Sequence, residues 1–171
     1  MATNWNLDPS HSEVTFKVKH LMITNVTGVL GKFDVKAEAS DDSFADAKIE
    51  FTGDAASITT NDQQRDGHLK TGDFFDVEKF PQFRFASTSY SNGKLTGDLT
   101  IRDVTKPVTL DVEFGGIGKD PFGNTKAGFS VSGKLNRKDW NLVWNAPLET
   151  GGLLVSDEVR INAEIQLVKA Q

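Results

Sequence analysis

The stretch VRINAEIQL, residues 159 to 167, carries the pattern on which the fold prediction depends. Apolar and polar residues alternate through it, and successive side chains of a β-strand point to opposite faces. The apolar positions are Val159, Ile161, Ala163, Ile165 and Leu167. The stretch is therefore predicted to form a strand with one buried and one exposed face.

The same alternation recurs along most of the chain. It predicts seven further strands, at residues 14–20, 29–39, 47–53, 83–85, 95–101, 108–114 and 127–135. Runs of turn-forming residues separate them at 40–43, 91–93 and 120–124. An irregular insert rich in Trp, Asn, Pro and Gly spans about 138–152. The chain is thus predicted to be all-β, with little else between its strands.

One stretch has helical character. Thr60 or Asn61 could cap a short helix that runs to about Leu69, with Asp62 near its positive end. This helix is the only one that the sequence predicts.

Eight strands with one apolar face each need a common core, as either a sandwich or a barrel. Long strands joined mostly in sequence order favour an up-and-down closed barrel, which at eight strands is wide enough for one small ligand. The prediction is an antiparallel eight-stranded barrel in a single domain over residues 1–171.

The composition limits the classes of partner. The 24 acidic and 19 basic residues give a net charge of −5, and the basic residues are scattered, which disfavours nucleic acid or an anionic membrane face as the main partner. The absence of cysteine excludes disulfides and thiol nucleophiles. No apolar run approaches the roughly 18 residues of a membrane span, so we do not expect an integral membrane protein. The displayed start has no export signal, so the expected location is the cytoplasm, or the periplasm if a signal has been removed.

The inward phase of the strands is rich in phenylalanine. The residues predicted to line the lumen are Phe16, Val18, Phe33, Phe51, Phe83, Phe85, Leu99, Leu110 and Phe129. Small residues alternate with them, among them Gly31, Gly53, Gly97 and Gly133. Large side chains beside small ones can leave a cavity, but the small residues can equally let a closed barrel bend and pack.

A polar cluster lies on the predicted helix. His68 with Asp66 nearby could act as a general base, or Arg65, Asp66 and His68 could form a network that ties the helix to the barrel rim. No nucleophile motif accompanies them. The three histidines lack metal-ligand spacing, and His20 ends a strand, which is typical of a hydrogen-bonded core or rim residue.

Motifs along essentially the whole chain closely resemble the YceI-like family. They are Asp8-Pro9-Ser10-His11-Ser12, Val26-Thr27-Gly28, Arg65-Asp66-Gly67-His68-Leu69-Lys70 with Asp73-Phe74-Phe75-Asp76, Thr105-Lys106-Pro107-Val108, and Asn136-Arg137-Lys138-Asp139-Trp140 with Trp144. Two departures are the missing export signal and Asn141, which stands where the family usually has glycine.

The resemblance implies a lipocalin-like barrel, with the short helix covering one end and an elongated lumen that binds a polyisoprenoid or related long-chain amphiphile. No enzymatic activity and no cofactor beyond such a lipid is implied. Candidate ligand contacts at the rim are His20, Arg65, Asp66, His68, Arg137, Trp140 and Trp144. A phosphate head group would need cationic donors, for which Arg65, Arg137 and Lys70 are available. A quinone would need only neutral hydrogen bonds.

Two alternatives stay open. One is a binder of fatty acids or fatty amides, and the other, from a different class, is a hydrolase or isomerase that uses His68 and Asp66. A homodimer is also left open.

Overall fold

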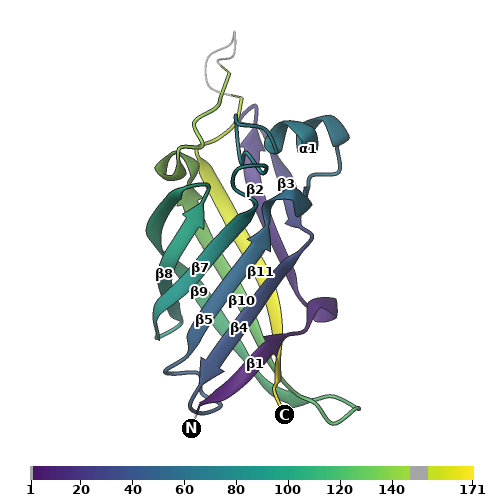
Figure 1. The fold of residues 1–171 in the computed structure, drawn as a ribbon, viewed down its shortest axis with the longest axis vertical. Helices are drawn as coiled ribbons and strands as arrows, with labels where there is room; N and C mark the ends of the chain where they lie inside the picture. Colours follow the sequence, from purple (N-terminus) through teal and green to yellow (C-terminus); the bar gives the residue numbers. More distant parts are fainter. Residues whose placement is uncertain (1, 147–153) are drawn as a thin grey trace.

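Eleven strands form one antiparallel sheet in the computed structural model, which describes residues 2–146 and 154–171 (Figure 1). The strands are β1 (Thr3–Leu7), β2 (Glu13–His20), β3 (Thr24–Leu30), β4 (Phe33–Ala39), β5 (Lys48–Asp54), β6 (Ile58–Thr59), β7 (Gln82–Ser91), β8 (Lys94–Ile101), β9 (Val104–Lys119), β10 (Thr125–Asn136) and β11 (Glu158–Lys169). The helical elements are η1 (Pro9–His11), η2 (Ala55–Ser57), α1 (Gln63–Leu69) and η3 (Arg137–Trp140).

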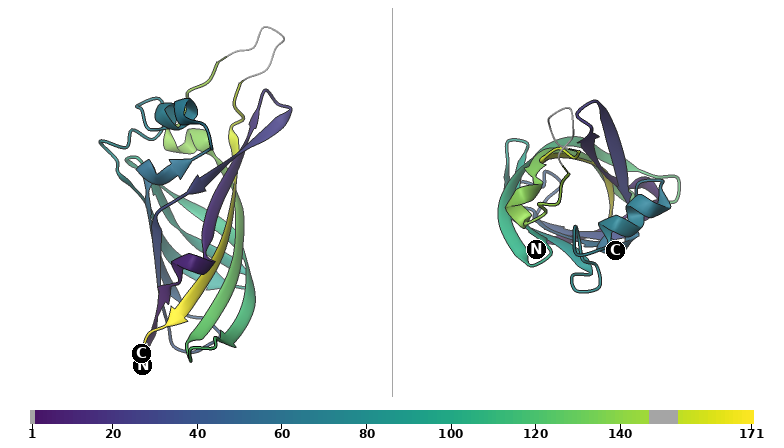
Figure 2. Two further views of the ribbon diagram at one scale, coloured as in Figure 1. Left: turned by 90° about the vertical axis from the view of Figure 1, so that its right-hand side faces the viewer. Right: turned by 90° about the horizontal axis from the view of Figure 1, so that it is seen from above.

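The sheet closes into a barrel because β1 pairs with both β4 and β11. Between them, β4, β5, β7, β8, β9, β10 and β11 are hydrogen-bonded neighbours in that order. This ring confirms the predicted antiparallel eight-stranded barrel, with one short α-helix at its upper end (Figures 1 and 2).

The β2–β3 hairpin completes the upper part of the wall. The last residues of β11, Leu167–Lys169, pair with β1, whereas its earlier residues, Arg160–Glu164, pair with β2. Next to β2, β3 pairs with the short β6. One edge of β11 is therefore shared by two partners, β2 along its first part and β1 along its last part.

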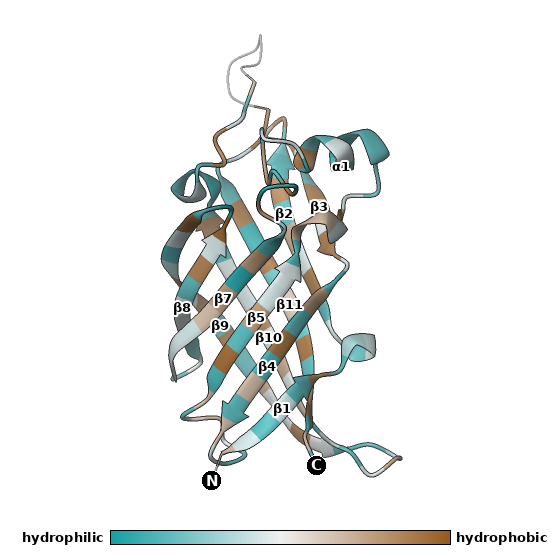
Figure 3. Cartoon of the chain, viewed as in Figure 1, coloured by the Kyte–Doolittle hydropathy of each residue, from teal (hydrophilic) through white to brown (hydrophobic). Residues whose placement is uncertain are grey.

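Hydropathy alternates along the strands as the sequence predicts (Figure 3). In β11 every second residue, from Val159 opposite Leu135 to Leu167 opposite Ala127, is apolar. All five of these residues line the inside of the barrel. Alternation thus predicts correctly which face of these strands is inward.

The predicted strand at 29–39 is wrong as a single element. Val29 and Leu30 end β3, whereas Phe33 begins β4, because the chain turns at Gly31, whose N–H donates to the Ser57 carbonyl at 3.0 Å. Apolar alternation continues across the turn, so it hides the break.

Several other boundaries differ from the prediction, among them β7, which runs over Gln82–Ser91 and not only 83–85. The strand β1 was not predicted, because its asparagines have low strand propensity. The strand β9 extends well beyond 108–114, and Gly116, at φ 106°, lies beside a register shift in its pairing with β10. The helix cap is Asp62 rather than Thr60 or Asn61, since Asp62 accepts from the Arg65 N–H. The end of the insert at 147–152 lies outside the described residues.

Outside the barrel, Asp8 anchors η1 to the hairpin between β9 and β10. Its carboxylate accepts from Lys126 Nζ and from the Ser10 hydroxyl, and it lies 2.8 Å from His11 Nδ1. The hydrogen bond from Lys126, more than any other contact, holds the pKa of Asp8 far below its usual range. The Asp8 and Lys126 side chains are both largely buried.

Candidate functional site

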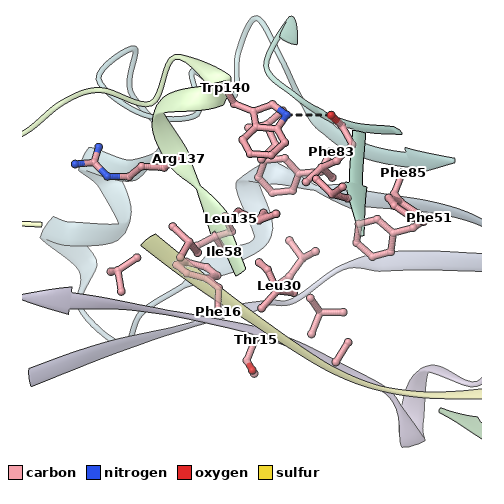
Figure 4. A pocket seen from close by; sticks show the side chains of 18 of the residues that line it. Thr15, Phe16, Leu30, Phe51, Ile58, Phe83, Phe85, Leu135, Arg137 and Trp140 are labelled. Atoms are coloured by element: carbon pink, nitrogen blue, oxygen red, sulfur yellow. Dashed lines mark hydrogen bonds between the residues drawn. The ribbon is translucent and has the colours of Figure 1, made fainter. Parts of the chain in front are cut away.

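The barrel encloses one large apolar cavity of about 580 Å³ among the residues that the structure describes. All of the predicted lumen residues except Phe33 line it, from β2, β5, β7, β8, β9 and β10. Figure 4 shows Phe16, Phe51, Phe83 and Phe85 around this space. The volume falls in the range of about 300 to 1,000 Å³ that is typical of small-molecule sites.

Phe33 does not line this cavity, which corrects the prediction for that residue. It lines a separate pocket with Pro9, Gly31 and Lys32, on the seam between β4 and β3. The reason is that β1 pairs only with residues 36–39 of β4, so no strand covers the edge of β4 at the level of Phe33. The Phe33 ring itself packs beside Phe51, with the ring centroids 6.0 Å apart.

A plug of packed side chains forms the floor of the cavity. Phe44, which is 1% exposed, enters from the connection between β4 and β5 and meets Trp5, Phe114 and Phe129 at centroid distances of 5.0 to 5.5 Å. Below it the small residues Ala37 and Ala127 are buried in the same core. The sequence gives little signal for Phe44, since it lies within a polar run that predicts a turn.

Glycines under the aromatic rings shape the wall. A Cβ added at Gly97 would lie 2.5 Å from the Phe85 ring, and one at Gly28 would lie 2.2 Å from the Phe16 ring. The outer end of each ring therefore occupies the space above a neighbouring glycine, which a Cβ would fill. The small residues thus allow close packing within the wall, while the centre of the barrel contains a cavity. The two alternatives for the small residues, close packing and a cavity, therefore apply at different places.

At the mouth, three aromatic rings connect opposite segments. His68 of α1 and Phe74 of the loop after it pack against Trp144, with centroid distances to the indole of 4.7 and 5.4 Å. His68 Nε2 lies 2.8 Å from Asp73 Oδ2. We call His68, Phe74 and Trp144 the latch, because they join the helix to the segment after β10 across the mouth.

Asp66 does not line the cavity. Burial raises its pKa, but hydrogen bonds from the Thr60 hydroxyl and N–H and from the Thr59 hydroxyl outweigh it, so the pKa is below its usual value. Asp66 therefore braces the helix against β6. Its partners are these threonines, while the carboxylate beside His68 belongs to Asp73, so the structure does not form the His68–Asp66 pair that the enzyme alternative requires.

Arg137 holds the backbone segments at the mouth together, and it is only 4% exposed. Its guanidinium donates to the carbonyls of Leu142, Trp144 and Ser156 at 2.6 to 2.9 Å. Burial lowers the pKa of Arg137, and the nearby Asp157 partly offsets that effect. Although it borders the cavity, its donors are already used by the backbone.

Trp140 and Asn141 fix the same segment. The Trp140 indole N–H donates to the Leu99 carbonyl at 3.0 Å, drawn as the dashed line in Figure 4. Asn141 ends η3 at φ 61°, in the left-handed region that glycine and asparagine adopt most easily. Asparagine at this position therefore satisfies the backbone requirement that glycine would otherwise meet.

The polar groups that border the cavity are basic or neutral. Within the described part of the chain its lining includes Lys19, Arg65 and Arg137 but neither aspartate nor glutamate. Arg65 donates from Nε and Nη2 to Thr60, at 2.7 Å each, which leaves Nη1 without a partner in the described part of the chain. His20 also borders the mouth, where its backbone forms an isolated antiparallel β-bridge with Val155. Lys19 and Arg65 can thus attract a negative head group.

Several lining residues were missed by sequence reasoning. Tyr90 faces inward because a register shift between Ser87 and Ser89 changes the phase of β7. Phe75 packs on Phe83 at 5.1 Å, and Leu142 is buried at the mouth. Strand periodicity cannot place residues of loops, and a bulge interrupts it.

Two absences concern the described residues only. No group of three His, Asp or Glu side chains that could hold a metal is found there. The helices of that part are also too short to cross a membrane.

Comparisons with known proteins agree on one family. The family model described as a YceI-like domain matches residues 5–167. A UPF0312 protein of Staphylococcus aureus is 39% identical over 165 residues, which cover 96% of each chain. The YCEI protein of Campylobacter jejuni superposes with a TM-score of 0.77 at 35% identity, covering 96% of this chain and 97% of that one.

A more distant structure shares the fold alone. It is a polyisoprenoid binding domain from Saccharophagus degradans, with a TM-score of 0.73 at 10% identity, covering 97% of this chain and 98% of that one.

Proposed function

This chain belongs to the YceI-like domain family, and from that membership and the shape of its cavity we propose that it binds a long-chain isoprenoid lipid for transport or storage. The observation that carries the proposal is the apolar cavity, which extends from Phe44 at the floor to the latch at the mouth. A prenyl chain has no polar atoms, so it gains by leaving water for such walls at roughly 25 cal/mol per Å² buried.

The mouth favours an anionic head group over a neutral one. Lys19 and the free Nη1 of Arg65 border the opening, and no carboxylate of the described residues lines it. Charge-assisted hydrogen bonds to phosphate are about twice as strong as neutral ones. We therefore propose a polyprenyl phosphate as the preferred ligand, with a quinone as a weaker one.

A fatty acid is the second candidate, because its carboxylate suits the same cations. Branched prenyl chains are wider than straight acyl chains, and the Phe16 and Phe85 rings pack over glycines of the wall of a cavity of about 580 Å³. This shape supports the isoprenoid. The distant Saccharophagus degradans domain, described as polyisoprenoid binding, supports it by analogy of fold.

We also propose that the protein is a carrier and not a catalyst. His68 is engaged by Asp73 and by two aromatic rings, and no side-chain hydroxyl of the described residues is hydrogen-bonded to its ring. A side-chain nucleophile activated by His68 would have to lie within hydrogen-bond reach of its ring.

Mass spectrometry of lipid extracted from natively purified protein tests the proposal. We expect a series of masses separated by one isoprene unit. The matched control is Ala163→Phe, which fills the cavity from β11, where small neighbours Val14 and Val131 flank the position. This variant should copurify with little lipid. Straight-chain acids in the wild type would favour the second candidate, and equal lipid in both proteins would place the lipid outside the cavity.

A further inference from the structure

The turn between β2 and β3 presents apolar side chains to solvent at the mouth. Leu21, Met22 and Ile23 are 38%, 53% and 75% exposed. The hairpin projects past the rim on the side opposite the chain termini (Figure 2). We call these three residues the tip.

The backbone of the tip makes these side chains unexpected. Leu21 and Met22 have φ of 54° and 62°, in the left-handed region that Asn and Gly adopt most easily in turns. Bulky side chains are conformationally strained in this region. The turn is held in place, since the Leu21 N–H donates to the Leu154 carbonyl at 2.9 Å. Strain at both positions indicates that the apolar side chains of the tip contribute to function.

The charge around the tip differs from that of the whole chain. Residues 14–33 contain Lys17, Lys19 and Lys32 and no acidic residue, although the chain carries a net charge of −5. Lys17 and Lys19 are exposed and form no ion pair with the described residues. The whole-chain charge argues against an anionic surface as a partner, but this hairpin is locally basic.

The tip is continuous with the cavity. Val18, Lys19 and His20, which lead into it, all border the cavity. Across the rim, Val143 is 59% exposed between Leu142 and Trp144, both of which line the cavity. The lining of the cavity therefore reaches the base of the tip.

We propose that the tip inserts into the head-group region of an anionic lipid bilayer and places the mouth of the cavity against it. This inference rests on the proposed function, since a long-chain lipid has to be exchanged with a membrane. Apolar side chains flanked by lysines are the combination that binds a membrane interface. Insertion would bury Met22 and Ile23 while Lys17 and Lys19 meet the phosphates.

The test is flotation with vesicles of phosphatidylcholine and phosphatidylglycerol, using the variant Leu21→Asn/Met22→Gly/Ile23→Ser. Asn-Gly suits the turn, so this variant should melt no lower than the wild type. We expect vesicle association to weaken at least about tenfold, because the apolar side chains that would be buried in the bilayer are removed. The matched control is Phe122→Ser, since Phe122 is 88% exposed on the β9–β10 turn at the opposite end. It should float like the wild type.

Binding of farnesyl phosphate from solution separates this inference from the proposed function. The tip variant should bind it as the wild type does, because its cavity is intact. If the wild type floats with vesicles but does not bind farnesyl phosphate, the proposed function is overturned and the docking inference still holds. Equal flotation of wild type and tip variant would overturn the docking inference. So would a wild type that does not float but forms a tip-dependent dimer in sedimentation, because the tip would then bind a second copy.

Discussion

The ring of Phe44 meets the ring of Phe129 edge-on, with centroids 5.0 Å apart, and this contact closes the lower end of the cavity. Phe44 comes from a connection between strands and Phe129 from the wall, so part of the floor of the lumen is a side chain inserted from a loop.

Replacing this side chain should lengthen the cavity. We expect Phe44→Ala to cost about 3 to 5 kcal/mol of stability, as for other buried phenylalanines, and to shift the copurified lipids to longer chains. Phe44→Leu, which keeps most of the volume, should give a smaller change in both. Mass spectrometry and urea denaturation measure the two effects. An unchanged chain length in a folded Phe44→Ala protein would show that the floor lies elsewhere.

Adding a methyl group at Gly97 should destabilise the protein without filling the lumen. The new Cβ would lie 2.5 Å from the Ala86 carbonyl oxygen and from the Phe85 ring, and the backbone oxygen cannot easily move. We expect Gly97→Ala to cost about 1 to 3 kcal/mol. At Gly67, where a Cβ meets nothing within 4 Å, alanine should not destabilise the protein. Thermal melting compares the two, and equal melting would contradict the proposed role of Gly97.

Opening the latch should speed ligand exchange. Trp144→Ala removes the ring against which His68 and Phe74 pack, while Arg137 still holds the Trp144 carbonyl. We expect the dissociation rate to rise about tenfold or more, since an aromatic pair contributes roughly 0.5 to 1.5 kcal/mol beyond its buried area. Stopped-flow displacement of a fluorescent polyene measures the rate. Phe122→Ala, far from the mouth, is the control, and equal rates in wild type and Trp144→Ala would exclude a gating role.

Acid should weaken the anchor between Asp8 and Lys126. Because the folded-state pKa of Asp8 lies below its unfolded value, its contribution is present above about pH 4 and is lost as the pH falls below that value. Asp8→Asn should cost about 1.5 to 3 kcal/mol at pH 7, as for other hydrogen bonds to charged groups. The difference from wild type should shrink at pH 3. Asp98→Asn, on the exposed face of β8, serves as the control in urea titrations. A difference that does not change with pH would contradict this assignment.

Period-two alternation predicts much of this structure because it reports a local property, the side of the strand on which a residue lies. It predicts an inward face for Phe16 and Phe85, and both line the cavity. It fails where a change of direction or phase keeps the apolar pattern, as at Gly31 and at the bulge that turns Tyr90 inward.

The candidate site at the mouth is harder to read from sequence. The sequence groups Arg65, Asp66 and His68, but the structure gives them different partners: Thr60 for the first two and Asp73 with Trp144 for the third. These contacts are set by how loops pack on one another. Hydrophobic periodicity contains no information about such packing.

The pairing of β1 with β11 sets the order in which the protein can assemble. Trp5 is opposite Lys169, so nearly the whole chain must be synthesised before these strands meet. Until then one edge of β1 and one edge of β2 lack their partner β11, and both present unpaired edges that other chains can join. Contacts this distant in sequence make folding slow. The nascent chain therefore has a long interval in which it is prone to aggregate, and a bound chaperone would have its largest effect before β11 appears.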